Sequence, residues 1–174
     1  NSVERLTRHL NKGIPKDAQK SYLAFVRTMV SNHPIIHIDD SDVIKPEGCK
    51  FEALGLVRDG SKSTNTKTVY EKGYHVTEAC VLTGNNHPVS IFSRIQSSKE
   101  KNYTSTNSVT FSAMERGASL FGKATFVMDR GYDDNKMFLK LDALKQDYVI
   151  RLKSNRKLFY HNKWVMATEL RNRR

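Results

Sequence analysis

The sequence predicts an α/β protein in which a mixed β-sheet is flanked by helices. Strand-like apolar runs alternate with segments whose apolar residues recur every three or four positions, in the order strand, hairpin, helix, strand, helix, strand. The polar sequence Gly84-Asn85-Asn86 lies between two strand-like runs and favours an antiparallel hairpin. The later strands are separated by helices, which favours parallel pairing.

Two helices and one strand are expected at the start of the chain. Residues 3–10 and 16–31 have helical spacing, and in the second segment one face would carry Ala18, Tyr22, Phe25, Val26, Met29 and Val30. Residues 33–44, HPIIHIDDSDVI, form an apolar run that ends in acids, and His37 within it is expected to lie in the core. Residues 56–72 are polar and rich in turn formers, so a loop is expected there.

Strands and helices alternate through the rest of the expected fold. The expected strands cover residues 74–84, 87–98, 124–129 and 147–153. The expected helices cover residues 106–121 and 134–145. No internal repeat or low-complexity segment is present.

Length and composition are typical of a globular domain. The chain has 174 residues, of which 38% are apolar, enough for one domain with a core. No stretch approaches the roughly 20 apolar residues of a membrane helix, so we expect no membrane partner and a cytoplasmic location. Cys49 and Cys80 lack zinc-site spacing and suit a reducing compartment. The polar ends of the chain lead us to expect a piece of a longer protein.

The positive charge lies at the two flanks of the sequence. Residues 1–32 hold six Lys or Arg and two Asp or Glu, residues 33–147 hold fifteen of each, and residues 148–174 hold eight and one. Basic flanks around a neutral centre favour a polyanion such as nucleic acid as the partner.

Carboxylates follow two of the expected strands. Asp39, Asp40 and Asp42 follow the first apolar run. Asp129 follows a later apolar run, which ends at Met128 in the sequence FVMDRGYDD. A buried carboxylate is costly unless it is paired, and a divalent metal shared between adjacent strands is one solution. Helix capping or pairing with a basic residue is the alternative interpretation for each single acid.

One motif imitates a phosphate-binding loop. Residues 117–124, GASLFGKA, nearly match G-x-x-x-x-G-K-[ST], but Ala124 has no hydroxyl. The motif also closes a helix and precedes a strand, which reverses the order that a phosphate loop needs. Gly122 is better interpreted as the C-terminal cap of that helix.

Two blocks of the sequence resemble the catalytic core of DDE transposases of bacterial insertion sequences, particularly the family named after insertion sequence 4. The second block is VMDRGYDDNKMFLKL followed by DYVIRLKSNRKL, where that family shows a strand, D-R-G-Y-D, a helix and a further strand. IIHIDDSDVIKPEGCKFEALGLVRDGS resembles the first block, and GYHVTEACVL resembles the strands between the two blocks. The resemblance is collinear over roughly residues 33–158.

The resemblance implies a ribonuclease-H-like sheet and three regions of the chain. These are a basic helical segment at 1–32, an incomplete catalytic core at 33–154 and the start of an insertion at 155–174. It also implies cleavage of DNA and transfer of the freed 3′-hydroxyl to target DNA, with two Mg²⁺ or Mn²⁺ ions held by three carboxylates. The partners would be double-stranded transposon ends and target DNA, bound by a homo-oligomer in the bacterial nucleoid.

By this pattern Asp129 is the second catalytic carboxylate and metal ligand. Asp39 is the preferred first one, because it fits the pattern D-x-[ST], while Asp40 is the alternative, because it directly precedes a hydroxyl residue. Strand alternation puts the two on opposite faces. The third residue, a glutamate, is expected beyond residue 174, since Glu169 is more simply a surface acid.

Basic residues near the two blocks are the expected DNA contacts, namely Arg130, Arg151, Lys153, Arg156 and Lys157. A module that binds nucleic acid without any chemistry is the alternative hypothesis, because the basic flanks alone would support binding and the third carboxylate is missing.

Overall fold

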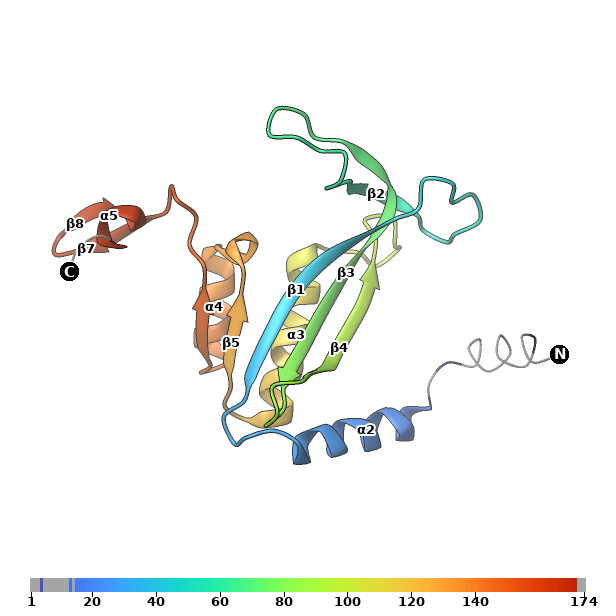
Figure 1. Cartoon of the computed structure of the whole chain (residues 1–174), viewed down its shortest axis with the longest axis horizontal. Coiled ribbons are helices and arrows are strands. Elements are labelled where there is room, and N and C mark those ends of the chain that lie inside the picture. Colours follow the sequence, from blue (N-terminus) through green and yellow to red (C-terminus); the bar gives the residue numbers. More distant parts are fainter. Residues whose placement is uncertain (1–3, 5–12, 14, 172–174) are drawn as a thin grey trace.

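A computed structural model describes Glu4, Gly13 and residues 15–171 of the chain. Its principal helices are α2 (Lys16–Thr28), α3 (Thr106–Phe121), α4 (Asn135–Ala143) and α5 (Ala167–Arg171), with a 3-10 turn, η1, at Arg130–Tyr132 (Figure 1). Its strands are β1 (Ile35–Ile44), β2 (Gly55–Arg58), β3 (Tyr70–Leu82), β4 (Pro88–Gln96), β5 (Thr125–Met128), β6 (Asp147–Ile150), β7 (Lys157–Tyr160) and β8 (Lys163–Met166).

Six strands form one mixed sheet, which confirms the predicted α/β class and fits a ribonuclease-H-like fold. The strand order is β2-β3-β1-β5-β6, and β4 also pairs with β3. β1 pairs antiparallel with β3 and parallel with β5, and β5 pairs parallel with β6. β2 and β4 pair with successive parts of β3, so they share one of its edges.

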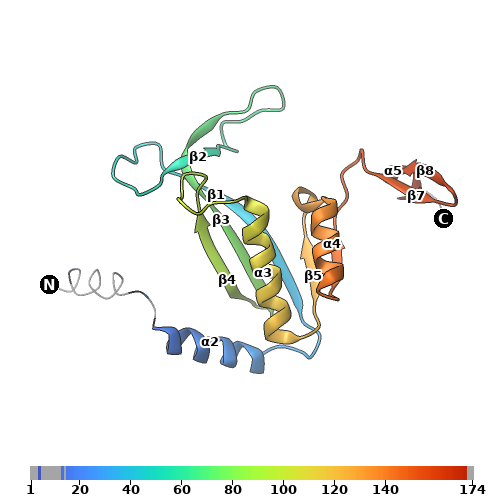
Figure 2. The same ribbon diagram turned by 180° about the vertical axis from the view of Figure 1, so that it is seen from behind.

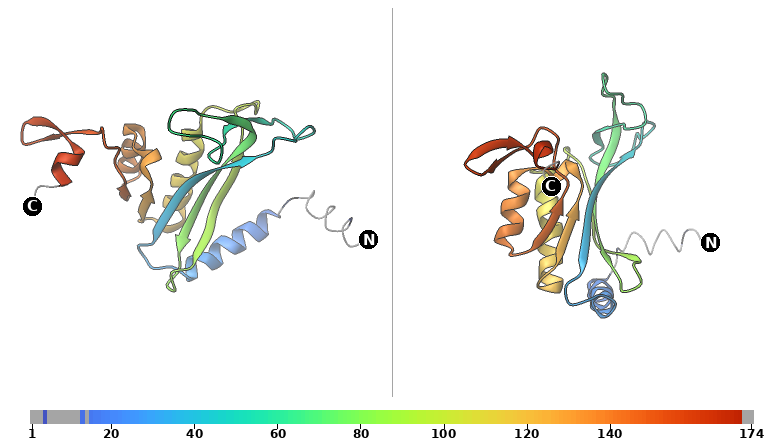
Figure 3. Two further views of the ribbon diagram at one scale, coloured as in Figure 1. Left: turned by 45° about the horizontal axis from the view of Figure 1, so that its top comes forward. Right: turned by 60° about the vertical axis from the view of Figure 1, so that its left-hand side comes forward.

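Helices α3 and α4 cover one face of the sheet and leave the other face open (Figures 2 and 3). We call these the helical face and the open face. The core lies between the sheet and the two helices. Its fully buried side chains include Ile36, Ile38, Val81, Met114, Phe126 and Leu141. The sheet therefore has one dry face and one face in contact with solvent.

Strand β1 shows this difference residue by residue. Ile36 and Ile38 are buried on the helical face, whereas Ile35 and His37 are exposed on the open face. The expectation of a core position for His37 is therefore wrong. The same alternation continues into the acids, so Asp40 follows the buried isoleucines and Asp39 follows His37.

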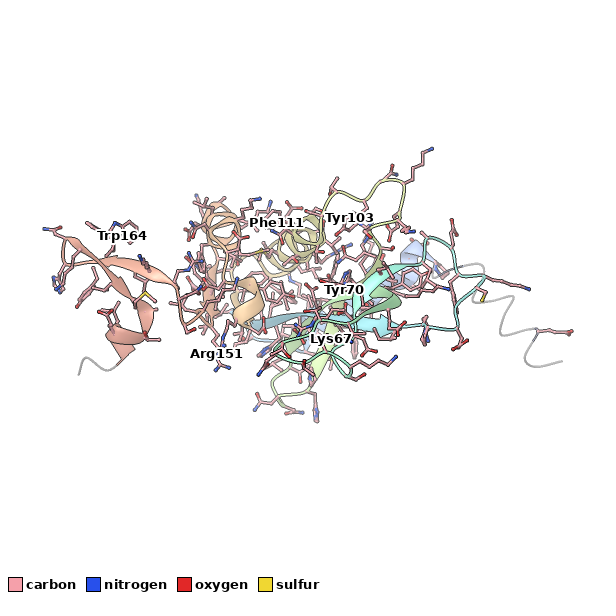
Figure 4. The ribbon with its side chains drawn as sticks, turned by 90° about the horizontal axis from the view of Figure 1, so that it is seen from above. Lys67, Tyr70, Tyr103, Phe111, Arg151 and Trp164 are labelled. Atoms are coloured by element: carbon pink, nitrogen blue, oxygen red, sulfur yellow. The ribbon has the colours of Figure 1, made fainter. Side chains whose placement is uncertain are left out.

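The loop expected over residues 56–72 is partly strand. β2 lies within it, and β3 begins at Tyr70 rather than at residue 74. Four residues are too few for a strand to show a clear alternation in a polar surrounding. Tyr70 and Lys67 mark this end of the sheet in Figure 4, a view of the molecule from above.

Helix α2 packs across one end of the sheet and contacts α3 and β4. Leu23 and Val26 are its buried residues. The predicted inward face is therefore correct for Val26 and wrong for four exposed residues, Ala18, Tyr22, Phe25 and Met29. The other expected helix, over residues 3–10, lies outside the described residues apart from Glu4. Within the part of the chain that the structure describes, no helix is long and apolar enough to cross a membrane.

Helix α3 ends as its sequence predicts. Gly122 caps it with a φ of 75°, a backbone conformation that favours glycine, and its N–H donates to the Ala118 carbonyl. The Lys123 ammonium donates to the Lys145 carbonyl and to Asp147. The residues that resemble a phosphate loop thus close a helix and begin the turn into β5.

The chain after β6 forms a separate two-stranded sheet. β7 and β8 pair antiparallel, and α5 packs against β8. We call residues 157–166 the hairpin. It stands apart from the six-stranded sheet in Figures 1 and 3.

Candidate metal site

The end of β5 brings the predicted carboxylates together. β1 and β5 pair in parallel from Ile35 with Thr125 to Ile38 with Met128, and β5 stops there. Asp129 therefore follows a strand end, as expected. Asp39 and Asp40 instead lie inside β1, which continues to Ile44 along β3. The site therefore lies where β5 ends beside β1, which continues past it.

A cleft of about 360 Å³ opens at this point. It is lined by Asp39, Asp40 and Asp129, by the turn residues Gly131 and Tyr132, by the start of α4 and by the first turns of α3. Four acids line it, because Asp134 from the start of α4 is also present. The Asp134 carboxylate caps α4 by accepting from the Lys136 amide at 2.9 Å.

Asp129 is oriented by the turn that follows it. Its Oδ1 accepts a hydrogen bond from the Gly131 amide at 2.6 Å and so caps η1. A Cβ atom on residue 131 would lie 2.9 Å from that oxygen, closer than such atoms normally approach. Glycine at this position lets the backbone come close to the carboxylate, which explains the D-R-G order of the sequence.

Asp40 is held by a buried polar pair that the sequence did not reveal. The Thr77 hydroxyl donates to Asp40 Oδ1 at 2.5 Å, and the Gln96 amide donates to the Thr77 hydroxyl at 2.9 Å. Thr77 and Gln96 are both fully buried. Burial raises the pKa of Asp40, and the hydrogen bond from Thr77 only partly offsets this effect.

Tyr132 places a buried hydroxyl in the same cleft. The residue is 6% exposed, and its hydroxyl lies beside the Asp40 carboxylate, with which it interacts. Burial, together with the nearby charges of Asp40, Asp39 and Asp129, raises the pKa of Tyr132, so the hydroxyl remains protonated. The hydroxyl is therefore a neutral polar group in the acidic lining of the cleft.

Asp133 faces away from the cleft. Its fully buried carboxylate forms an ion pair with Arg156, at 2.5 Å, and accepts from the Lys153 amide at 2.7 Å. Burial would raise the pKa of Asp133, but the hydrogen bonds from Arg156 and Lys153 and their positive charges outweigh it, and the pKa lies below its usual value.

The five predicted DNA contacts occupy three places. Arg130 is exposed in η1, beside the cleft. Lys153, Arg156 and Lys157 surround Asp133 in a second, smaller cleft. Arg151 is exposed, and Figure 4 shows it on the opposite side of the molecule from Phe111 of α3.

Glu169 does not line the cleft. It lies in α5, where its carboxylate accepts from the Met166 amide at 3.4 Å. In the described part of the chain, no group of three or more His, Cys, Asp or Glu side chains is arranged to hold a metal ion.

The mixed sheet flanked by helices is consistent with a ribonuclease-H-like fold, and three predicted carboxylates lie together where β5 ends. A family model described as the transposase DDE domain matches residues 31–173, and the chain belongs to that family. None of the curated proteins compared with the chain matches it. Membership makes this a transposase domain, whose substrate is DNA and whose relatives typically use divalent metal ions.

Proposed function

We propose that the chain is the metal-dependent catalytic core of a cut-and-paste transposase. It would cleave DNA strands at the ends of a bacterial insertion sequence of the family named after insertion sequence 4, and transfer the freed 3′-hydroxyl to target DNA. The observation that carries the proposal is the cleft that Asp39, Asp40 and Asp129 line together where β5 ends. Two Mg²⁺ or Mn²⁺ ions bound there would polarise the phosphodiester and activate its attacker.

Asp129 and one residue of β1 would hold the ions. The sequence pattern favours Asp39, whereas burial favours Asp40, because a partly buried carboxylate gains most from a cation. The Asp40 carboxylate is also held in place by Thr77, while no side-chain hydrogen bond among the described residues involves the Asp39 carboxylate. We therefore propose Asp40 and Asp129 as the two metal ligands, with Asp39 as the alternative to Asp40.

A third carboxylate would complete the ligand set. The acids that line the cleft are all aspartates, and Glu169 is held at α5. This supports a glutamate supplied from outside the described residues, with residues 33–154 as the core, 155–174 as the start of an insertion and 1–32 as a basic helical addition.

DNA would lie across the carboxylate cleft. Arg130, Arg151, Lys153 and Lys157 are the proposed phosphate contacts, since they are exposed around the end of the sheet. Arg156 is better suited to a supporting role, because its guanidinium already binds Asp133 and Asn135. We further propose that two copies of the chain form a homo-oligomer that acts on paired transposon ends.

The test is a thermal-shift titration with Mn²⁺ on the wild type and on Asp39→Asn, Asp40→Asn and Asp129→Asn. We expect Mn²⁺ to raise the Tm of the wild type, and the shift to disappear in Asp129→Asn and Asp40→Asn. Asp42→Asn is the matched control, because Asp42 lies on the same face of β1 but contacts His75 at 2.5 Å outside the cleft.

The outcomes separate the hypotheses. Loss of the shift in Asp39→Asn instead of Asp40→Asn would select the other ligand. Equal shifts in all five proteins would exclude the metal site and leave a module that binds nucleic acid without chemistry.

A further inference from the structure

A groove of about 620 Å³ lies between α2 and the C-terminal half of α3. Its floor is apolar and consists of Leu23, Ala24 and Leu120. Leu23 is buried and Leu120 is partly buried, whereas Ala24 is exposed. Figure 2 shows α2 meeting α3 near the C-terminal end of α3, and the two helices are in contact. All the described residues that line the groove belong to these two helices.

The groove follows the axis of α2. Its lining includes pairs of residues that are four positions apart, namely Lys20 with Ala24, Leu23 with Arg27, and Arg116 with Leu120. Residues four positions apart lie one above the other on the same side of a helix. From Lys20 to Arg27 the lining extends over about 10 Å, which is two helical turns. The groove therefore has the length to hold a short third helix.

Three cations surround the apolar floor. They are Lys20, Arg27 and Arg116, and each is exposed. No Asp or Glu is among the described residues that line the groove, and none of the three cations forms an ion pair or a side-chain hydrogen bond with another described residue. Glu115, the acid next to Arg116, is instead paired with Lys140 of α4. We call this site the basic groove, and its uncompensated positive charge favours an anionic partner.

The combination of an apolar floor and a basic rim indicates the kind of partner. An amphipathic helix with acids beside its apolar stripe would bury that stripe on the floor and bring its carboxylates to the cations. A nucleic acid fits the groove less well. Its phosphates match the cations, but the described lining contains no aromatic ring on which bases stack, and a duplex has no apolar stripe to bury.

The basic groove and the candidate metal site lie at opposite ends of α3. Asn107 in the first turn of α3 lines the carboxylate cleft, whereas Leu120 in its last turn lines the groove. The helix rises by about 20 Å between these two residues. A partner that occupies the groove would therefore leave the carboxylates accessible.

We propose that the basic groove docks an acidic amphipathic helix of a partner protein. The apolar stripe of that helix packs between α2 and α3, and its carboxylates pair with Lys20, Arg27 and Arg116. This inference requires neither a metal ion nor DNA, so it stands or falls independently of the proposed function.

The probe is a set of three labelled synthetic peptides of about 15 residues, a length at which helices begin to be stable. The first has leucines three and four positions apart, flanked by glutamates. The second has lysines in place of the glutamates, and the third has serines in place of the leucines. Fluorescence anisotropy is measured at about 0.15 M salt, where charges more than about 8 Å apart are screened. We expect only the first peptide to bind.

A substitution in the floor tests whether the peptide lies in the groove. Ala24→Tyr fills the groove with a ring and should weaken binding of the acidic peptide by on the order of tenfold or more. Ala18→Tyr adds the same ring at another exposed position of α2 that does not line the groove, so its affinity should equal that of the wild type.

A substitution in the rim tests the charge. Lys20→Glu should weaken binding of the acidic peptide roughly three- to tenfold, because it replaces an attraction with a repulsion. Lys101→Glu makes the same change at an exposed lysine outside the groove and should leave the affinity unchanged. Circular dichroism of each variant establishes that it is folded.

Three results would overturn the basic groove as a site for an acidic helix. The first is an acidic peptide that binds no better than the lysine or serine peptide. The second is an unchanged affinity in both Ala24→Tyr and Lys20→Glu. The third is a DNA duplex that displaces the acidic peptide and loses affinity in Lys20→Glu, which would assign the groove to nucleic acid.

Discussion

The two faces of the six-stranded sheet differ in how firmly they hold their side chains. On the helical face, Phe126 and Ile38 are fully buried under α3 and α4. On the open face, Ile35 is 43% exposed and Val149 is 60% exposed. The same strand therefore carries tightly packed and loosely held residues in alternation.

The difference matters most for the adjacent acids of β1. Asp40 belongs to the helical face, where Thr77 and Gln96 restrict it and burial raises its pKa. Asp39 alternates with it along β1 and is exposed, although it too lines the cleft. Two acids that are adjacent in the sequence therefore differ in burial and in hydrogen bonding. A carboxylate that must hold a fixed position is better placed on the helical face, where neighbouring side chains restrict it.

The largest expected effect concerns packing. Phe126→Ala should lower the free energy of unfolding by about 3–5 kcal/mol, because it opens a cavity beneath α3. Val149→Ala on the adjacent strand should cost under about 1 kcal/mol, since its side chain is largely in water. Urea denaturation measures both values. Similar losses in the two variants would show that the faces do not differ as described.

The next effect concerns the buried ion pair. Asp133→Asn should lower the free energy of unfolding at neutral pH by about 2–3 kcal/mol, because it leaves Arg156 without its charged partner. Since the folded-state pKa of Asp133 is lowered, its contribution is present above the unfolded pKa of about 3.9 and is lost as the pH falls through the folded value.

Urea denaturation at neutral and strongly acidic pH checks the prediction for Asp133. The difference between wild type and variant should shrink in acid. The exposed Asp17→Asn serves as the control and should show little difference at either pH. A difference for Asp133→Asn that is constant with pH would contradict the role of its charge.

A smaller effect is expected at Thr77. Thr77→Val keeps the shape but removes the hydroxyl that links Gln96 to Asp40, which should cost about 1–2 kcal/mol of stability and weaken Mn²⁺ binding. Thr77→Ser keeps the hydroxyl and should retain both properties. Thermal shift with and without Mn²⁺ distinguishes them, and equal behaviour of the two variants would argue against the hydrogen-bond chain.

The smallest effect is a gain in stability. The folded-state pKa of Asp40 is raised, so its favourable contribution is complete below the unfolded pKa and is lost as the pH rises through the folded value. At neutral pH without metal, Asp40→Asn should therefore be slightly more stable than wild type, whereas Asp39→Asn should be unchanged. Tm values across the pH range test this, and a lower Tm for Asp40→Asn at neutral pH would refute it.

Much of the fold follows from local patterns in the sequence. The alternation before Asp129 and the helical spacing of α3 predict those elements, because each buries one continuous apolar surface. β2 was missed because it is short and lies in a polar segment. Phe25 was assigned to the wrong face, since helical spacing does not say which side of α2 meets the sheet.

The candidate site could be predicted only in part. Asp129 and the pair Asp39–Asp40 follow from their positions along apolar runs. The partnership of Asp40 with Thr77 and Gln96 depends on three strands lying in one register, which no local pattern encodes. The ion pair between Asp133 and Arg156 likewise joins an acid to which sequence reasoning gave no role and a residue that it assigned to DNA binding.

The parallel pairing of β1 with β5 also has a consequence for the order in which the protein folds. Ile35 pairs with Thr125, so about 90 residues must be arranged before these partners meet. The β3–β4 hairpin and α3 form from contacts much closer in sequence, and we expect them to fold first because loop closure over long separations is slow. The carboxylates would then meet late in folding, so the proposed metal site would be absent from a nascent or half-folded chain.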